Sequence, residues 1–96
     1  MPQKIDTSII IPAYNEEVII RQSLKALADY YKANLKFLGA TEVIVVAAGN
    51  DRTPQIAKEF KNSFASLKVV TPARKVGKGR DVRLGFKEAT GEVQIF

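Results

Sequence analysis

The chain has 96 residues, with 15 Lys and Arg against 10 Asp and Glu, and it contains no His, Cys or Trp. The lack of Cys excludes disulfides, thiol nucleophiles and Cys-ligated metal centres, and the lack of His excludes His-dependent triads. No apolar run approaches the roughly 20 residues that span a bilayer, so we expect a cytoplasmic protein without a transmembrane segment. This length predicts one domain, or part of one, over residues 1–96.

The net charge of +5 comes entirely from the second half of the chain. Residues 1–48 hold five basic and five acidic side chains, whereas residues 49–96 hold ten and five. Most of the excess lies between Arg74 and Arg83. A clustered positive charge predicts an anionic partner such as phosphate, nucleic acid or an acidic membrane surface.

Four short apolar runs predict buried β-strands, at residues 8–11, 42–47, 67–70 and 92–96. Strands that are covered on both faces need not alternate between apolar and polar residues, which fits these runs. Pro12 is expected to end the first strand, because proline cannot donate a backbone hydrogen bond.

Three segments between these runs predict amphipathic helices. Asn15 is the expected cap of the first helix and Thr53 of the second, with Pro54 at the first helical position. Residues 36–41 are expected to break the helical pattern. The apolar side chains expected on the inner faces are Ile20, Leu24, Leu27 and Tyr31 in the first helix, Ile56, Phe60 and Phe64 in the second, and Val82, Phe86 and Ala89 in the third.

The resulting order is β-α-β-α-β-α-β. Such alternation predicts an α/β fold with an open, mainly parallel sheet and helices on both faces. Ligands of open α/β sheets bind beyond the carboxyl ends of the strands. The loops expected at those ends are residues 12–16, 47–51 and 71–79.

The first two loops offer polar groups at the expected ligand edge. Tyr14 supplies a flat ring with a hydroxyl, and Glu16 supplies an acceptor for N–H or O–H groups. The same residues also suit a plain turn between a strand and a capped helix. In the second loop, the run from Gly49 to Thr53 is mostly typical of turns and helix caps.

The third loop, Arg74–Arg80, combines two glycines with several cations next to an expected helix start. Glycines let backbone N–H groups approach a ligand, so the combination suits a diphosphate. A solvated basic loop is the alternative. The segment is neither the GxGxxG dinucleotide fingerprint nor a P-loop.

Taken together, these segments resemble the amino-terminal, Rossmann-like half of the family-2 glycosyltransferases with the GT-A fold. The matching segments are residues 8–17, 42–46, 51–53, 77–79 and 85–96. The strand that ends in Pro-x-Tyr-Asn-Glu is the most specific of them.

The resemblance implies a site for a nucleotide-diphospho-sugar, whose sugar a full-length form would transfer to an unknown acceptor. Pro12, Tyr14 and Glu16 would contact the nucleoside. Lys78 and Arg80 would lie near the phosphates, and Asp51 matches an acid that can alternatively cap a helix. The residues implied for binding are Pro12, Tyr14, Asn15, Glu16, Asn50, Asp51, Lys78 and Arg80.

The chain departs from the family pattern at two places. The family usually has an Asp-Asp pair after the second strand, one of which accepts the N–H of the base, whereas this chain has Ala47 and Ala48. The Asp-x-Asp motif that binds Mg²⁺ or Mn²⁺ in the family falls beyond Phe96, as do the catalytic base and the acceptor site. The chain therefore carries no expected metal ligand and no expected catalytic residue, and is interpreted as a truncated product or a fragment.

A second hypothesis is a catalytically inactive domain that serves as an interaction module and forms homo-oligomers. Ala47 and Ala48, the missing metal motif and an apolar last strand favour it. Nucleic acid is not an expected partner, because exposed aromatic residues are not interleaved with the cations.

Overall fold

The computed structural model describes residues 4–71, 89–91 and 93–95 of the chain. Three parts of the sequence-based interpretation lie outside these residues: most of the predicted third helix, the glycine-rich basic loop, and with that loop Lys78 and Arg80.

Four parallel strands form one sheet in the order β3-β2-β1-β4. Their bounds are Thr7–Tyr14 for β1, Thr41–Ala48 for β2, Ser66–Val70 for β3 and Val93–Ile95 for β4. The two strands with the longest apolar runs occupy the centre, as expected for strands covered on both faces. The predicted α/β fold with an open parallel sheet is confirmed.

The expectation that Pro12 ends the first strand was wrong, because β1 continues to Tyr14 and pairs with β2 along its whole length. The N–H groups of Thr7 and Asn15 both donate toward β2, to the carbonyls of Ala40 and Ala48. Parallel pairing alternates along a strand, so the nitrogen of Pro12 faces away from β2. The proline therefore costs no hydrogen bond between these two strands.

Three helices and one 3₁₀ turn complete the described chain: α1 (Glu17–Ala33), α2 (Leu35–Leu38), α3 (Thr53–Lys58) and η1 (Lys61–Ser63). Helix α2 occupies a segment that was expected to break the helical pattern. The second predicted helix was expected to carry Phe64, but α3 ends at Lys58 and Phe64 has an extended backbone. Asn and Ser, which follow Lys61, compete for backbone hydrogen bonds and disfavour a helix interior.

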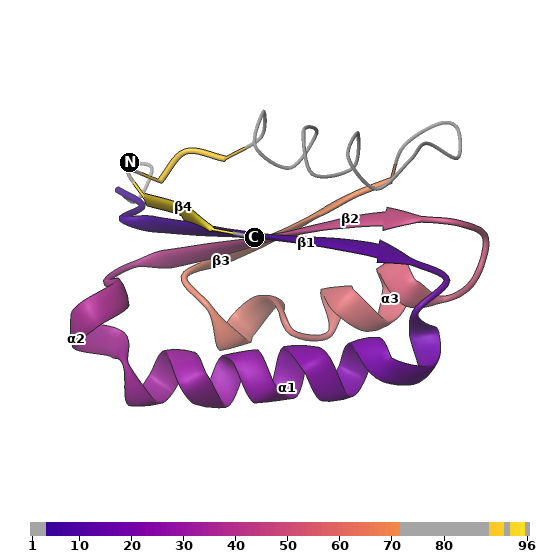
Figure 1. Cartoon of the computed structure of the whole chain (residues 1–96), viewed down its shortest axis with the longest axis horizontal. Helices are drawn as coiled ribbons and strands as arrows, with labels where there is room; N and C mark the ends of the chain where they lie inside the picture. Colours follow the sequence, from indigo (N-terminus) through magenta and orange to yellow (C-terminus); the bar gives the residue numbers. More distant parts are fainter. Residues whose placement is uncertain (1–3, 72–88, 92, 96) are drawn as a thin grey trace.

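Helices α1 and α3 both pack against one face of the sheet (Figure 1). The main core lies between these helices and the sheet. Burial of Ile20 and Leu24 confirms the predicted inner face of α1. A second cluster on the opposite face of the sheet consists of Ile10, Ile44 and Val46. The alternation of side chains along β1 and β2 assigns each residue to one of these two faces.

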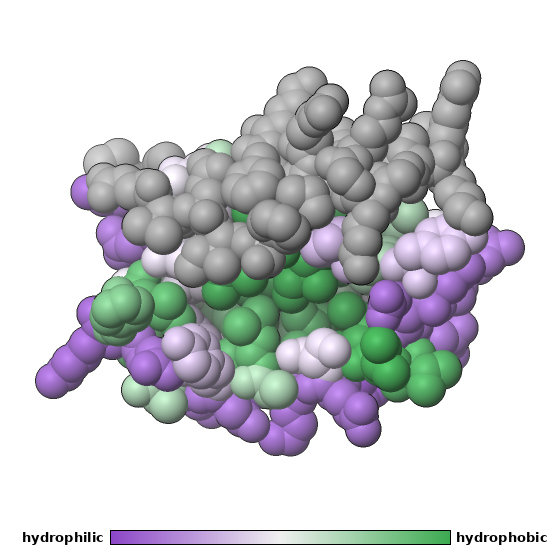
Figure 2. Space-filling view, in the orientation of Figure 1, coloured by the Kyte–Doolittle hydropathy of each residue, from purple (hydrophilic) through white to green (hydrophobic). Residues whose placement is uncertain are grey.

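Hydrophobic surface lies at both ends of the lower edge of the molecule, over the start of α1 and over α2 (Figure 2). Val18 in α1 and Phe37 in α2 are each 86% exposed. Among the described residues, no helix combines the length and the apolar character that crossing a membrane requires.

Candidate functional site

The carboxyl ends of β1 and β2 lie side by side, with Tyr14 paired in register with Ala48 (Figure 1). Two loops begin there, one leading from β1 into α1 and the other from β2 into α3. Residues 12–16 and 49–51 are therefore brought to one edge of the sheet. Six of the eight predicted binding residues belong to these loops or strand ends.

Asn15 joins the two loops to each other instead of capping α1. Its side-chain Oδ1 accepts a hydrogen bond from the backbone N–H of Asn50 at 3.0 Å. The Asn15 backbone has a φ of 48°, in the left-handed region that asparagine tolerates better than most residues. A Cβ on Gly49, which has a φ of 102°, would lie only 2.2 Å from Asn15 Oδ1. Glycine is therefore required at position 49 for this contact.

Asp51 fixes the starts of both helices. Its Oδ2 accepts a hydrogen bond from the N–H of Glu17 at 3.0 Å, and its Oδ1 accepts from the N–H of Thr53 at 3.0 Å. The Thr53 hydroxyl also donates to Oδ1 at 2.6 Å, and its oxygen accepts from the N–H of Glu16 at 2.9 Å. The predicted cap Thr53 is itself the first residue of α3, and its side chain is shared between the two loops.

The electrostatics of Asp51 follow from these contacts. Burial acts to raise the pKa of its carboxyl, but the hydrogen bonds from the side chain and backbone of Thr53 and from the backbone of Glu17 outweigh it and lower the pKa. Asp51 is therefore ionised at neutral pH, with both carboxylate oxygens engaged by the protein. A negative charge at two helix starts is also favourable to the helix dipoles.

The face of the sheet opposite α1 and α3 carries the side chains of Pro12 and Tyr14. Ala13 packs in the main core and Ile10 in the opposite cluster, so alternation places both residues on the Ile10 side. Tyr14 is 42% exposed. The face of an aromatic ring can stack on a flat, planar ligand group.

Ala47 and Ala48 are both buried where β2 ends. Their side chains offer no hydrogen-bond acceptor, so acceptors near them must come from the backbone or from neighbouring loop residues. The exposed side chain of Asn50 follows in the same loop, and the partly buried one of Glu16 lies in the loop that follows the paired strand β1. Within the part of the chain that the structure describes, no group of three acidic residues could hold a metal ion.

The sequence analysis did not predict a third polar cluster, which surrounds Glu42. Glu42, expected only as part of a buried strand, is 1% exposed near the amino end of β2. Burial acts to raise the pKa of its carboxyl, but hydrogen bonds from Ser8 and Thr90 and the charge of Lys68 outweigh it and lower the pKa. An acidic residue within an otherwise apolar run was the signal for this cluster.

The family follows from a direct comparison of sequences. The model of glycosyl transferase family 2 matches residues 8–96, which include both loops of the candidate site. The chain belongs to glycosyl transferase family 2. The resemblance noted in its strand-end segments is thereby confirmed.

Several known proteins are similar to most of the chain. A probable glycosyltransferase, YdaM, of Bacillus subtilis is 41% identical over 90 residues, which cover 90% of the chain and 20% of YdaM. The dolichyl-phosphate beta-glucosyltransferase of Mus musculus is 35% identical over 92 residues, 88% of the chain and 28% of that enzyme. The crystal structure of S. aureus TarS matches with a TM-score of 0.79 at 32% identity, covering 96% of this chain and 16% of TarS.

The chain therefore spans less than a third of the length of these relatives. The match to TarS agrees with the α/β fold observed here.

Proposed function

We propose that this chain forms the nucleotide-diphospho-sugar-binding part of a family-2 glycosyltransferase. The observation that supports it best is the edge at which Tyr14 stands beside Ala48, next to the linked loops of Asn15 and Asn50. Carboxyl ends of parallel strands are where open α/β sheets bind their ligands.

In this proposal the ring of Tyr14 stacks against the base, and Pro12 lines the same face of the sheet. Glu16 and Asn50 supply acceptors to the base or the ribose. Asp51 acts mainly by holding both loops, since its two oxygens already accept hydrogen bonds from Glu17 and Thr53.

Lys78 and Arg80 are proposed to lie near the diphosphate, because their cations suit phosphate oxygens. The transfer step itself, including the acceptor, is proposed for an enzyme of the length of the relatives. Among the described residues, no group of three or more acidic side chains could hold a metal ion, and the chain spans less than a third of the length of its relatives. The proposal for this chain is therefore limited to binding of the sugar donor.

The pair Ala47 and Ala48 bears on which base is bound. Without a carboxylate at the end of β2, the proposed site lacks one acceptor for a base N–H group. The loss of one such hydrogen bond in a desolvated pocket costs about 1–3 kcal/mol. We therefore expect weak discrimination among bases rather than strict selection of one.

Isothermal calorimetry with UDP-, GDP- and dTDP-sugars, with and without Mn²⁺, tests donor binding. We expect binding of at least one donor, and a loss of about tenfold in affinity on Tyr14→Ala, as for one lost stacking contact. Tyr30→Ala is the matched control, because Tyr30 is 55% exposed but lies near the far end of α1. Binding of no donor, or equal effects of the two variants, would contradict the proposal.

The second hypothesis, an inactive interaction module that forms homo-oligomers, draws support from the exposed side chains of Val18 and Phe37. Exposed apolar residues of this size are found at protein interfaces. Analytical ultracentrifugation separates the hypotheses: a stable oligomer that binds no sugar nucleotide favours the module, whereas a monomer that binds one excludes it.

A further inference from the structure

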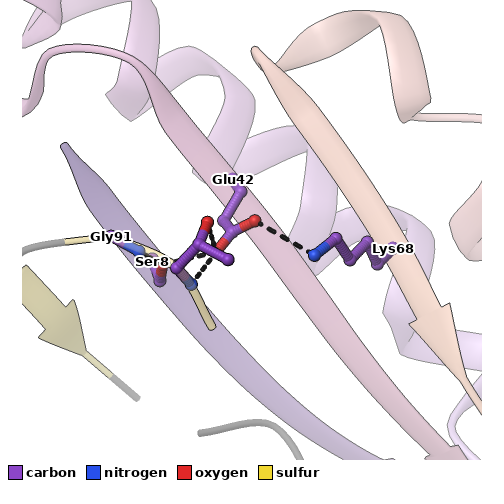
Figure 3. Close-up of polar contacts among 5 residues, drawn as sticks. Ser8, Glu42, Lys68 and Gly91 are labelled. Carbon is purple, nitrogen blue, oxygen red and sulfur yellow. Dashed lines mark hydrogen bonds and ion pairs between the residues drawn. The ribbon is translucent and has the colours of Figure 1, made fainter. Parts of the chain in front are cut away.

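One buried carboxylate on β2 contacts residues from the two neighbouring strands, β1 and β3, and from the segment that leads into β4. Glu42 on β2 lies opposite Ser8 on β1, and the Ser8 hydroxyl donates to Glu42 Oε1 at 2.6 Å (Figure 3). The same oxygen accepts from the backbone N–H of Thr90 at 2.7 Å and from its hydroxyl at 3.1 Å. The other oxygen, Oε2, lies 3.6 Å from Lys68 Nζ on β3.

Ser8 extends this cluster to Gly91. Its hydroxyl oxygen accepts a hydrogen bond from the backbone N–H of Gly91 at 2.8 Å while its proton is donated to Glu42 (Figure 3). A Cβ on Gly91 would lie 2.7 Å from Ser8 Oγ and 2.8 Å from the Ser8 backbone nitrogen. Only glycine allows so close an approach, so the chain just before β4 is held tightly against β1.

The position of the cluster separates it from any ligand at the site edge. Glu42 is the second residue of β2, whereas Ala48, at the site edge, is the last. Strand β4 pairs in parallel with β1, Val93 with Thr7 and Ile95 with Ile9. The carboxyl end of β4 therefore points to the same edge of the sheet as Tyr14. Glu42 itself lies at the opposite end of the sheet from that edge, and can influence it through the strand that it holds.

Burial of the charged Glu42 side chain costs free energy, and the need to fill space does not explain why a charged residue is found at this position. On the same face of β2, Ile44 and Val46 fill the next two positions with apolar side chains. A carboxylate is 2% exposed here and must give up its hydration, which is tolerable only when its oxygens are hydrogen-bonded. Among the described residues, the hydrogen bonds that it accepts come from Ser8 on β1 and from Thr90 in the segment before β4.

We propose that Glu42 is a positioning residue: it holds β4 in register against β1, and thereby sets where the carboxyl end of β4 lies at the edge that, on the proposed function, binds the sugar donor. Ser8 is its partner in this role, because the Ser8 hydroxyl oxygen accepts a hydrogen bond from the backbone N–H of Gly91. The role needs the hydrogen-bond acceptor of Glu42 rather than its bulk.

Hydrogen–deuterium exchange of the full 96-residue chain tests this role. Glu42→Met keeps the length of the side chain but removes the acceptor, whereas Glu42→Gln keeps an acceptor oxygen. Ile56→Val is the control for a general loss of stability, since Ile56 packs in the main core on the opposite face of the sheet. Ser8→Ala tests the same link from β1, should Glu42→Met fail to fold.

We expect Glu42→Met and Ser8→Ala to speed exchange of the peptide covering residues 89–95 by about 10- to 100-fold, the range for a lost buried hydrogen bond. The exchange rates of peptides within β2 and β3 should rise no more than they do in the Ile56→Val control. Glu42→Gln should restore most of the protection of residues 89–95. Exchange that rises evenly over all strands in Glu42→Met and Ser8→Ala, or protection that Glu42→Gln does not restore, would overturn the proposal.

Discussion

Asp51 Oδ2 accepts the backbone N–H of Glu17 across 34 positions of the sequence, which ties the loop after β2 to the first turn of α1. The first N–H groups of a helix have no partner within the helix, so a side chain from elsewhere must satisfy them. Asp51 serves α1 in this way and serves the start of α3 through Thr53. The geometry of the candidate site thus depends on one carboxylate.

Replacement of Asp51 should therefore weaken both helix starts. We expect Asp51→Ala to lower the free energy of unfolding by about 1–2 kcal/mol, the usual cost of a lost helix cap. Asp51→Asn retains one acceptor oxygen and should lose less. Urea unfolding followed by circular dichroism measures both variants, and equal stability of Asp51→Ala and the unchanged chain would contradict the assignment.

Gly49 should tolerate no side chain. Gly49→Ala puts a Cβ 2.2 Å from Asn15 Oδ1 at a φ of 102°, so we expect a loss of more than about 1 kcal/mol in unfolding free energy. Asn15→Gly removes the obstructing side chain. In the double variant, Gly49→Ala should cost less than it does alone, and a double-mutant cycle measures the difference. Strictly additive losses would show that the two residues do not compete for space.

The strands were predictable because their signal is local: each is a short apolar run, and the observed ends differ from the predicted ones by at most three residues. The main difference is β1, which runs through Pro12 because the proline nitrogen faces away from β2. Sequence alone does not show which side of a strand a nitrogen faces. The length of α3 was missed because Phe64 repeats the helical spacing yet reaches the core from an extended backbone.

Acid should destabilise the chain through Glu42 and Asp51. Both carboxyls have a lowered pKa in the folded state, so the unfolded chain binds more protons as the pH falls. Their stabilising contribution is present above the ordinary values of 4.5 and 3.8 and is lost as the pH falls through the lower folded values. Lys68 is the charged group that the structure places at Glu42, 3.6 Å away.

Urea unfolding at a series of pH values below neutrality measures this loss. Glu42→Gln removes one of the two groups, so its stability should fall less steeply between pH 5 and pH 3, a window set by the usual carboxyl range. The same slope in Glu42→Gln as in the unchanged chain would contradict a lowered pKa for Glu42.

The inner and outer faces of α1 should differ sharply in their response to truncation. Leu24 is 0% exposed and Val18 is 86% exposed on the same helix. We expect Leu24→Ala to cost about 2–5 kcal/mol in unfolding free energy, and Val18→Ala about 0.5 kcal/mol or less. Thermal unfolding of the two variants measures the contrast. Similar midpoints would mean that α1 does not pack as described.

The candidate site was only partly predictable. The structure places the Pro-Ala-Tyr-Asn-Glu segment at the carboxyl edge of the sheet, as predicted. The contacts of Asn15 and Asp51, however, join loops that are 34 or 35 positions apart. Such pairing is set by the register of β1 on β2 rather than by either segment. Lys78 and Arg80 remain predictions, because they lie outside the described residues.

Binding of the sugar donor at the carboxyl edge of the sheet is the central claim, and a titration of the ¹⁵N-labelled chain with UDP-glucose, followed by NMR amide shifts, tests it most directly. GDP- and dTDP-sugars serve as further donors in the same experiment. We predict concentration-dependent shifts at Tyr14, Gly49 and Asn50, with Ala40 and Thr41 at the opposite end unchanged. Shifts confined to the opposite end, or none with any donor, would contradict the claim.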